Sequence, residues 1–168
     1  LDCGCGGGAN IKTLLKLCPN GKVQGIDYSA VSVEKARKVN ARAIAAGRCT
    51  VQQASVAELP FKAEQFDVVT AFETVYFWPE LAQNFREVYR VLKPGGIFFI
   101  CNEANGETTK DDEWTQIIDG MTIYTDADLK VYLEQAGFGR AQSHKNKKGW
   151  LCVTAQKRTS PVWITRQI

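Results

Sequence analysis

Short runs of β-branched and aromatic residues recur along the chain and alternate with segments of helical spacing. These runs predict strands at 22–27, 49–54, 66–72 and 96–103. Strands that alternate with helices form βαβ units, the unit from which parallel sheets are built. The pattern therefore predicts a parallel sheet with helices on both faces.

Three of the intervening segments place apolar residues on one helical face. The first covers 29–47, begins at the expected N-cap Ser29, and carries Val33, Ala36, Val39, Ala43 and Ile44. The second starts at Glu80, is expected to end at the Pro-Gly-Gly run 94–96, and carries Leu81, Phe85, Val88 and Leu92. The third follows Asp126, ends at Gly137, and carries Leu129, Leu133 and Ala136.

The chain ends differently, with two successive strand-like runs at 139–146 and 149–156 separated by a Lys-Lys turn. Such a hairpin predicts that the last strand is antiparallel to its neighbours. We expect one domain over 1–157 and a C-terminal tail at 158–168. Because the sequence begins with Leu1, we also expect an upstream segment, a lid and the start of the first strand, to be absent from it.

Composition narrows the possible partners. A chain of 168 residues with 45% hydrophobic residues can bury one core. The net charge is only +3 and the basic residues are spread along the chain, so we expect no nucleic-acid partner. No apolar run approaches the length of a bilayer span, and we expect no membrane association.

The six cysteines show no CxxC pair, and four of them, Cys3, Cys49, Cys101 and Cys152, lie in or beside apolar runs. Reduced, buried thiols are expected there. The predicted location is therefore the cytoplasm, a reducing compartment.

The opening stretch LDCGCGGGAN predicts a ligand site. Leu1, Asp2 and Cys3 end a strand, and a helix with Ile11, Leu14, Leu15 and Cys18 follows the glycines. Glycine permits positive φ and close approach of a ligand to the backbone, while the helix N-terminus behind the turn offers free N–H groups. Four glycines, Gly4, Gly6, Gly7 and Gly8, exceed the one or two that a tight turn needs. The pattern favours a nucleotide-type ligand.

A second acid, Asp27, ends the next strand 23 residues after Gly4. A carboxylate there can accept hydrogen bonds from both ribose hydroxyls. The glycines also satisfy the GxGxxG/A dinucleotide pattern, so these two features leave NAD and other adenosine ligands equally open.

Further motifs identify a family. The chain carries DxGxGxG at 2–8, GIDYS at 25–29, ELPF at 58–61, FDVV at 66–69, REVYRVLKPGG at 86–96 and LEQAGF at 133–138. In this order and spacing they resemble class I S-adenosylmethionine-dependent methyltransferases, particularly the branch that acts on small molecules. The resemblance covers 1–157. It implies a Rossmann-like three-layer α/β/α sandwich whose mostly parallel seven-stranded sheet has the order 3-2-1-4-5-7-6 and an antiparallel strand 7.

The resemblance also implies S-adenosyl-L-methionine as the cofactor and S-adenosyl-L-homocysteine as its product. Asp2 and the backbone of Cys3, Gly4 and Gly6 would hold the methionine part. The ribose would bind Asp27, the adenine would lie by Tyr28, Ser55 and Val56, and the methionine end would border Phe72 and Glu73. The family often has an acid where this chain has Ser55.

The methyl acceptor is expected on the side of FETVYFW, 72–78, which follows the strand at 66–72. The catalytic candidates are Glu73, Tyr76 and, at the far end of the hairpin strand, His144. Phe77 and Trp78 either form an apolar wall or pack beneath the next helix. Glu73, Asn102 and Glu103 together could suggest a divalent metal, as in catechol-type methyltransferases. The rest of the sequence pattern of that family is absent, so we expect no metal.

The predicted activity is in-line transfer of a methyl group from the cofactor to a small-molecule acceptor. An Asn/Asp-Pro-Pro-Tyr/Phe motif, which would indicate nucleic-acid base methylation, is missing after 66–72. Two alternatives stay open: a cofactor-binding module without catalysis, and an NAD-type oxidoreductase, to which the LKPGG turn is foreign.

Overall fold

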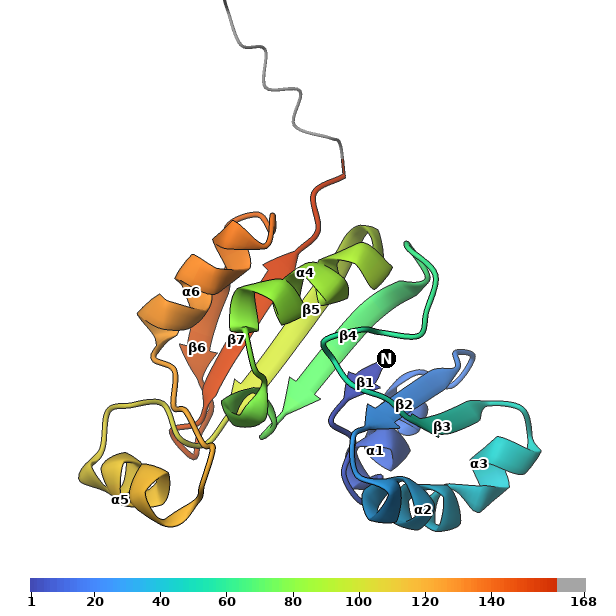
Figure 1. The fold of residues 1–168 in the computed structure, drawn as a ribbon. Helices are drawn as coiled ribbons and strands as arrows, with labels where there is room; N and C mark the ends of the chain where they lie inside the picture. Colours follow the sequence, from blue (N-terminus) through green and yellow to red (C-terminus); the bar gives the residue numbers. More distant parts are fainter. Residues whose placement is uncertain (160–168) are drawn as a thin grey trace, which may run out of the picture.

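The computed structural model describes residues 1–159, apart from the side chains of Lys110 and Asp112. Its seven-stranded sheet has the order β3-β2-β1-β4-β5-β7-β6, which confirms the implied fold (Figure 1). The strands are β1 Asp2–Cys3, β2 Val23–Asp27, β3 Cys49–Gln53, β4 Phe66–Phe72, β5 Leu92–Asn102, β6 Gln142–Lys145 and β7 Leu151–Gln156. β7 is antiparallel to both of its neighbours, as the terminal hairpin predicted.

Helices cover the sheet on both faces. They are α1 Ala9–Leu17, α2 Ala30–Val39, α3 Ala41–Ala45, α4 Leu81–Val91, α5 Thr109–Ile117 and α6 Asp126–Gln135, with a short 3₁₀ turn, η1, at Val75–Phe77. The smaller apolar cluster joins α1 and α2 to β2 and β3. The larger cluster packs α4 and α6 against β4, β5 and β7 (Figure 1). α5 belongs to neither layer and lies at the edge where the parallel strands end.

Two predicted helices have different bounds. The segment 29–47 breaks at Asn40 into α2 and α3, and the predicted N-cap Ser29 holds because its hydroxyl accepts from the Ser32 N–H. The helix after Glu80 ends at Val91, before the Pro-Gly-Gly run, because Leu92 already pairs with Phe66 in the sheet. Residues 93–96 shift the pairing register between β5 and β4, because Phe66 pairs with Leu92 whereas Val68 pairs with Ile97.

The remaining predictions had different outcomes. α5 was not predicted because it has no apolar face: among its described side chains, only that of Asp111 is buried. The hairpin strand expected at 139–146 is shorter, Gln142–Lys145. The cysteines that were expected to be interior, Cys3, Cys49, Cys101 and Cys152, are buried and free.

The predicted tail at 158–168 lies, beyond Thr159, outside the described residues. Among residues 1–159, no helix is both long and apolar enough to cross a bilayer.

The break at Asn40 ties α2 to the glycine turn. The buried Asn40 amide donates to the carbonyl oxygens of Gly8 and Ala36, both at 3.0 Å. We expect Asn40→Ala to lower the free energy of unfolding by about 1–3 kcal/mol, because both carbonyls lose a donor away from water. Urea denaturation measures this. Asn10→Ala, at an exposed position of α1, is the control and should change the free energy of unfolding by less than about 0.5 kcal/mol. Equal losses in the two variants would contradict the role of the Asn40 amide in holding α2 to the turn.

Candidate active site

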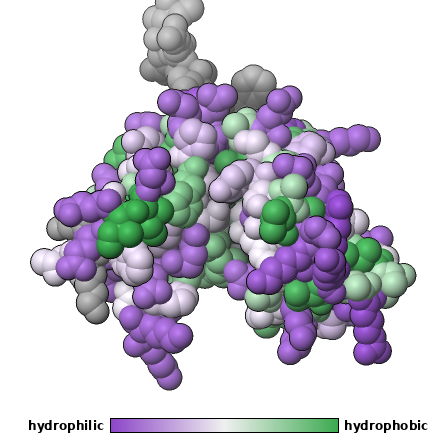
Figure 2. Space-filling model, turned by 60° about the horizontal axis from the view of Figure 1, so that its bottom comes forward, coloured by the Kyte–Doolittle hydropathy of each residue, from purple (hydrophilic) through white to green (hydrophobic). Residues whose placement is uncertain are grey.

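The parallel strands end at one edge of the sheet, where ligands of open α/β sheets bind. Figure 2 views the molecule from this edge: two lobes with largely hydrophilic outer surfaces flank a notch whose floor includes hydrophobic residues. The turn after β1, the end of β2 and the segment after β4 meet there (Figure 1).

The turn after β1 places bare backbone at this edge. Gly4 has φ +74, and a Cβ atom there would lie 2.1 Å from Thr74 Oγ1. The backbone N–H groups of Gly4 and Cys5 both donate to the Ile26 carbonyl oxygen at 2.8 Å, which fixes the turn against β2. Gly6, at φ +49, differs because a Cβ would meet nothing within 4 Å. The backbone of Gly6 therefore faces open space that a ligand can occupy.

Asp27, the acid that ends β2, is 7% exposed. Its Oδ2 accepts from the Gly6 N–H and its Oδ1 from the Ser29 N–H, both at 2.9 Å. An ionised carboxylate offers about four lone-pair positions, so each oxygen can accept a further hydrogen bond. The carboxylate thus shapes the glycine turn and retains capacity for a polyol ligand.

Asp2, in β1, is 1% exposed, and only one of its oxygens has a partner. Thr70 Oγ1 donates to Oδ1 at 2.8 Å, whereas Oδ2 has no hydrogen-bond partner. Burial raises the pKa of the Asp2 carboxyl to about 6, although the Thr70 hydrogen bond acts in the opposite direction. A buried carboxylate oxygen without a partner is costly, and a cationic donor would satisfy it.

A pocket of about 400 Å³ brings five of the predicted cofactor residues together. They are Gly4, Asp27, Tyr28, Ser55 and Val56, contributed by the ends of β1, β2 and β3. The same pocket is lined by Thr74, Phe77 and Trp78 from the segment after β4, and by Gly120. Thr74 and Gly120 were not predicted. The contact between Thr74 and Gly4 is long-range and has no local sequence signal.

Five predicted cofactor residues lie outside this lining: Asp2, Cys3, Gly6, Phe72 and Glu73. Cys3 is fully buried in the core and Asp2 lies in β1 beneath the turn. Phe72, at the end of β4, packs its ring against that of Phe99 with the centroids 5.6 Å apart.

A second pocket of about 250 Å³ lies on the other side of Phe77, which lines both. Its lining is mostly apolar and comes from Glu73, Tyr76, Phe77, Glu103, Ala104, Trp114, Ile118 and Met121. Trp78, by contrast, packs in the core against Phe85 and Phe98 and is 5% exposed. Of the two aromatic residues considered for an apolar wall, Phe77 therefore faces both pockets, while Trp78 is mainly a core residue.

Glu73 and Tyr76 form one hydrogen-bonded group in the second pocket. Tyr76 Oη accepts from the Ala104 N–H at 3.0 Å and donates to Glu73 Oε2 or to the Ala104 carbonyl oxygen, both at 3.3 Å. Glu73 Oε1 accepts from the Glu103 N–H. Burial raises the pKa of Glu73 above its usual range, although these hydrogen bonds oppose the shift. Glu73 also has a positive φ of 55, a strained conformation typical of functional positions.

Tyr76 stays protonated in this arrangement. Burial, followed by the charge of Glu73, raises the pKa of its hydroxyl above the ordinary value. His144, the third catalytic candidate, is exposed on β6, which β5 and β7 separate from β4. The structure thus joins Glu73 and Tyr76 and places His144 elsewhere.

The sheet order, the glycine turn and the acid after β2 define the fold of class I S-adenosylmethionine-dependent methyltransferases. Residues 1–100 match the family described as "Methyltransferase domain", and the chain belongs to that family.

Curated relatives share this domain with the chain. The chain is 31% identical over 123 residues to 24-methylenesterol C-methyltransferase 2 of Arabidopsis thaliana. The aligned region covers 72% of this chain and 34% of the plant protein. The chain is 36% identical over 106 residues to demethylmenaquinone methyltransferase of Symbiobacterium thermophilum, covering 62% and 42% respectively. The chain thus spans less than half of the length of these relatives.

Solved structures share the fold. A SAM-dependent methyltransferase from Aquifex aeolicus superposes with a TM-score of 0.79 at 22% sequence identity, over 93% of this chain and 80% of that one.

The two glycines of the turn should respond differently to alanine. Gly4→Ala adds a methyl group against Thr74 as well as the strain of positive φ, so we expect it to lower the free energy of unfolding by about 2–5 kcal/mol. Gly6→Ala meets no neighbour and should lower it by about 1–2 kcal/mol. Chemical denaturation compares them, and equal losses would contradict the close approach of Gly4 to Thr74.

Proposed function

We propose that this protein transfers a methyl group from S-adenosyl-L-methionine to a small apolar acceptor. The observation that carries the proposal is the 400 Å³ pocket at the glycine turn together with the partnerless oxygen of the buried Asp2. Membership of the methyltransferase family supports it.

The residues present fit this cofactor. Gly6 leaves open backbone, Asp27 has spare acceptor capacity for ribose hydroxyls, and Asp2 has a buried oxygen that a cationic ammonium group would satisfy. Tyr28, Ser55 and Val56 would then border the adenine, and the backbone of Cys3 and Gly4 the methionine part. When bound, the cofactor supplies a methyl group on a positively charged sulfur.

The second pocket is the proposed acceptor site. Phe77 lines both pockets, so an acceptor there would approach the donor past Phe77, from the side of Glu73. Its mostly apolar lining would exclude water, which favours transfer. The names of two relatives, a sterol and a demethylmenaquinone methyltransferase, support an acceptor of apolar ring or isoprenoid chemistry.

Glu73 is the proposed general base and Tyr76 the residue that positions it. Burial raises the pKa of Glu73, which makes its carboxylate a stronger base towards a proton of an acceptor hydroxyl or carbon. Tyr76, whose oxygen is held by the Ala104 N–H, orients that carboxylate. His144 lies on β6 and has no step in this scheme.

Cofactor binding should depend on pH through Asp2. Without ligand its pKa is about 6; a bound ammonium group would lower it, so the complex would hold fewer protons than the free protein. We therefore expect the affinity for S-adenosylhomocysteine to be constant above pH 7 and to fall by up to about tenfold per pH unit below 6. Calorimetry between pH 5 and 8 measures this.

The Asp2→Asn variant should bind more weakly and lose this pH dependence, whereas the exposed Asp67→Asn should behave as wild type. NAD, titrated in parallel, should not bind. Binding of NAD alone would refute the methyltransferase proposal.

The role of Glu73 can be separated from cofactor binding. Glu73→Gln removes the base, so we expect kcat to fall by about 10²–10⁴-fold with the affinity for S-adenosylhomocysteine unchanged. Transfer of a tritiated methyl group into a non-saponifiable lipid extract measures the rate. Glu103→Gln, which removes the neighbouring carboxylate from the same pocket, is the control and should keep kcat within about threefold. An unchanged rate in Glu73→Gln would exclude it as the base.

A further inference from the structure

The α5 helix, which forms part of the second pocket, is not held in place by apolar packing. Its large apolar side chains are exposed, Trp114 by 48% and Ile117 by 75%. The one described α5 side chain that is buried is a carboxylate, Asp111, at 7%. Helices usually gain their stability from an apolar face against the core, so polar contacts must fix the position of α5.

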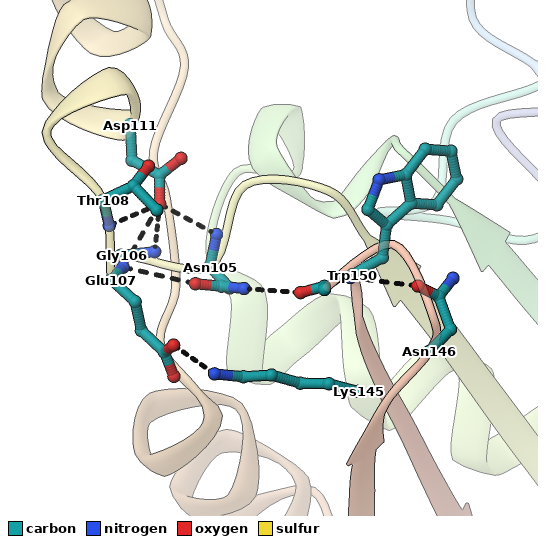
Figure 3. Close-up of polar contacts among 9 residues, drawn as sticks. Asn105, Gly106, Glu107, Thr108, Asp111, Lys145, Asn146 and Trp150 are labelled. Carbon is teal, nitrogen blue, oxygen red and sulfur yellow. Dashed lines mark hydrogen bonds and ion pairs between the residues drawn. The ribbon is translucent and has the colours of Figure 1, made fainter.

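Asp111 binds a concave run of backbone N–H groups (Figure 3). Its Oδ2 accepts from four successive residues: Asn105 at 3.2 Å, Gly106 at 2.8 Å, Glu107 at 3.2 Å and Thr108 at 3.4 Å. Such a backbone nest binds anions. Although burial acts to raise the pKa of Asp111, these hydrogen bonds outweigh burial and lower it. The carboxylate is therefore ionised and held at one point.

The same loop is attached to the β6–β7 hairpin (Figure 3). The Asn105 amide donates to the Gly149 carbonyl oxygen at 3.2 Å, and Glu107 forms an ion pair with Lys145. Within the hairpin, Asn146 Oδ1 accepts from the N–H groups of Lys148 and Trp150, which fixes the turn. The nest thus connects the start of α5 to a rigid hairpin of the sheet.

From this anchor, α5 and the turn after it extend over the second pocket. Trp114, Ile118 and Met121 line it opposite Glu73 and Tyr76. At the far end of the segment, the Thr122 N–H donates to the Tyr76 carbonyl oxygen at 2.9 Å. A shift at either attachment would move these apolar side chains relative to the Glu73 carboxylate.

We propose that Asp111 is a positioning residue for the acceptor: its bond to the backbone nest sets where α5 and the turn after it place Trp114 and Ile118 on the acceptor pocket. This inference rests on the proposed assignment of that pocket. Asp111 itself touches no reacting atom and acts through the helix. Loss of its charge should therefore weaken acceptor binding more than cofactor binding, because the segment gives the second pocket three apolar side chains and the first pocket Gly120, which has none.

The chain offers a matched control. In α6 the Thr125–Asp128 pair has the same spacing as Thr108–Asp111, and Asp128 Oδ2 accepts from the Thr125 N–H at 2.9 Å. α6, however, packs in the core through Leu129 and Leu133 rather than on the second pocket. Asp128→Asn therefore weakens a similar start of a helix that does not line the second pocket.

The test compares Asp111→Asn with Asp128→Asn, using geraniol as a neutral isoprenoid probe. Calorimetry of protein saturated with S-adenosylhomocysteine gives the geraniol Kd. We expect Asp111→Asn to weaken geraniol binding by about tenfold, and Asp128→Asn to leave it within about twofold. Both variants should bind S-adenosylhomocysteine within about threefold of wild type, because the segment contributes to the first pocket Gly120, which has no side chain. Hydrogen exchange at 105–121 should increase only in Asp111→Asn.

Unchanged geraniol affinity in Asp111→Asn, equal weakening in both variants, or no geraniol binding by the wild type would overturn the proposal. Failure of the proposed function gives a different result. In that case wild-type protein binds geraniol with the predicted dependence on Asp111 but transfers no methyl group to any lipid extract.

Discussion

The close approach of the Gly4 backbone to Thr74 is the constraint on which the site depends. It brings the end of β4 against the turn after β1, with no room for a methyl group between them. The Asp27 carboxylate holds the other side of the turn through the Gly6 N–H. Because both contacts form within the protein, the pocket exists before any ligand arrives, and binding need not order the loop.

Acidic residues at this edge have different tasks because their surroundings differ. Asp27 has two backbone donors and stabilises the turn, whereas Asp2 has one donor and a buried oxygen without a partner. Glu73, directly after β4, is joined instead to Tyr76 and to the backbone of Glu103, directly after β5. Asp27 lines the first pocket and Glu73 the second, and Phe77 borders both.

The sequence predicted the fold well because β4, β5 and β7 carry apolar runs, and because the motifs of a known family mark the turns. It predicted five residues of the first pocket for the same reason, since they follow strand ends. It did not predict α5, whose described side chains other than Asp111 lack burial, or the break at Asn40, which depends on a bond to Gly8. Thr74 was missed because only the folded chain brings it to Gly4.

The two apolar clusters and the polar attachment of α5 have a consequence for how such proteins diversify. The interior on which folding depends contains none of the described side chains of α5, so mutations in 109–121 can change the wall of the second pocket at little cost to the core. The glycine turn tolerates no such change. Under the proposed assignment, substitutions of Trp114, Ile118 or Met121 would alter the shape of the second pocket and leave the glycine turn unchanged.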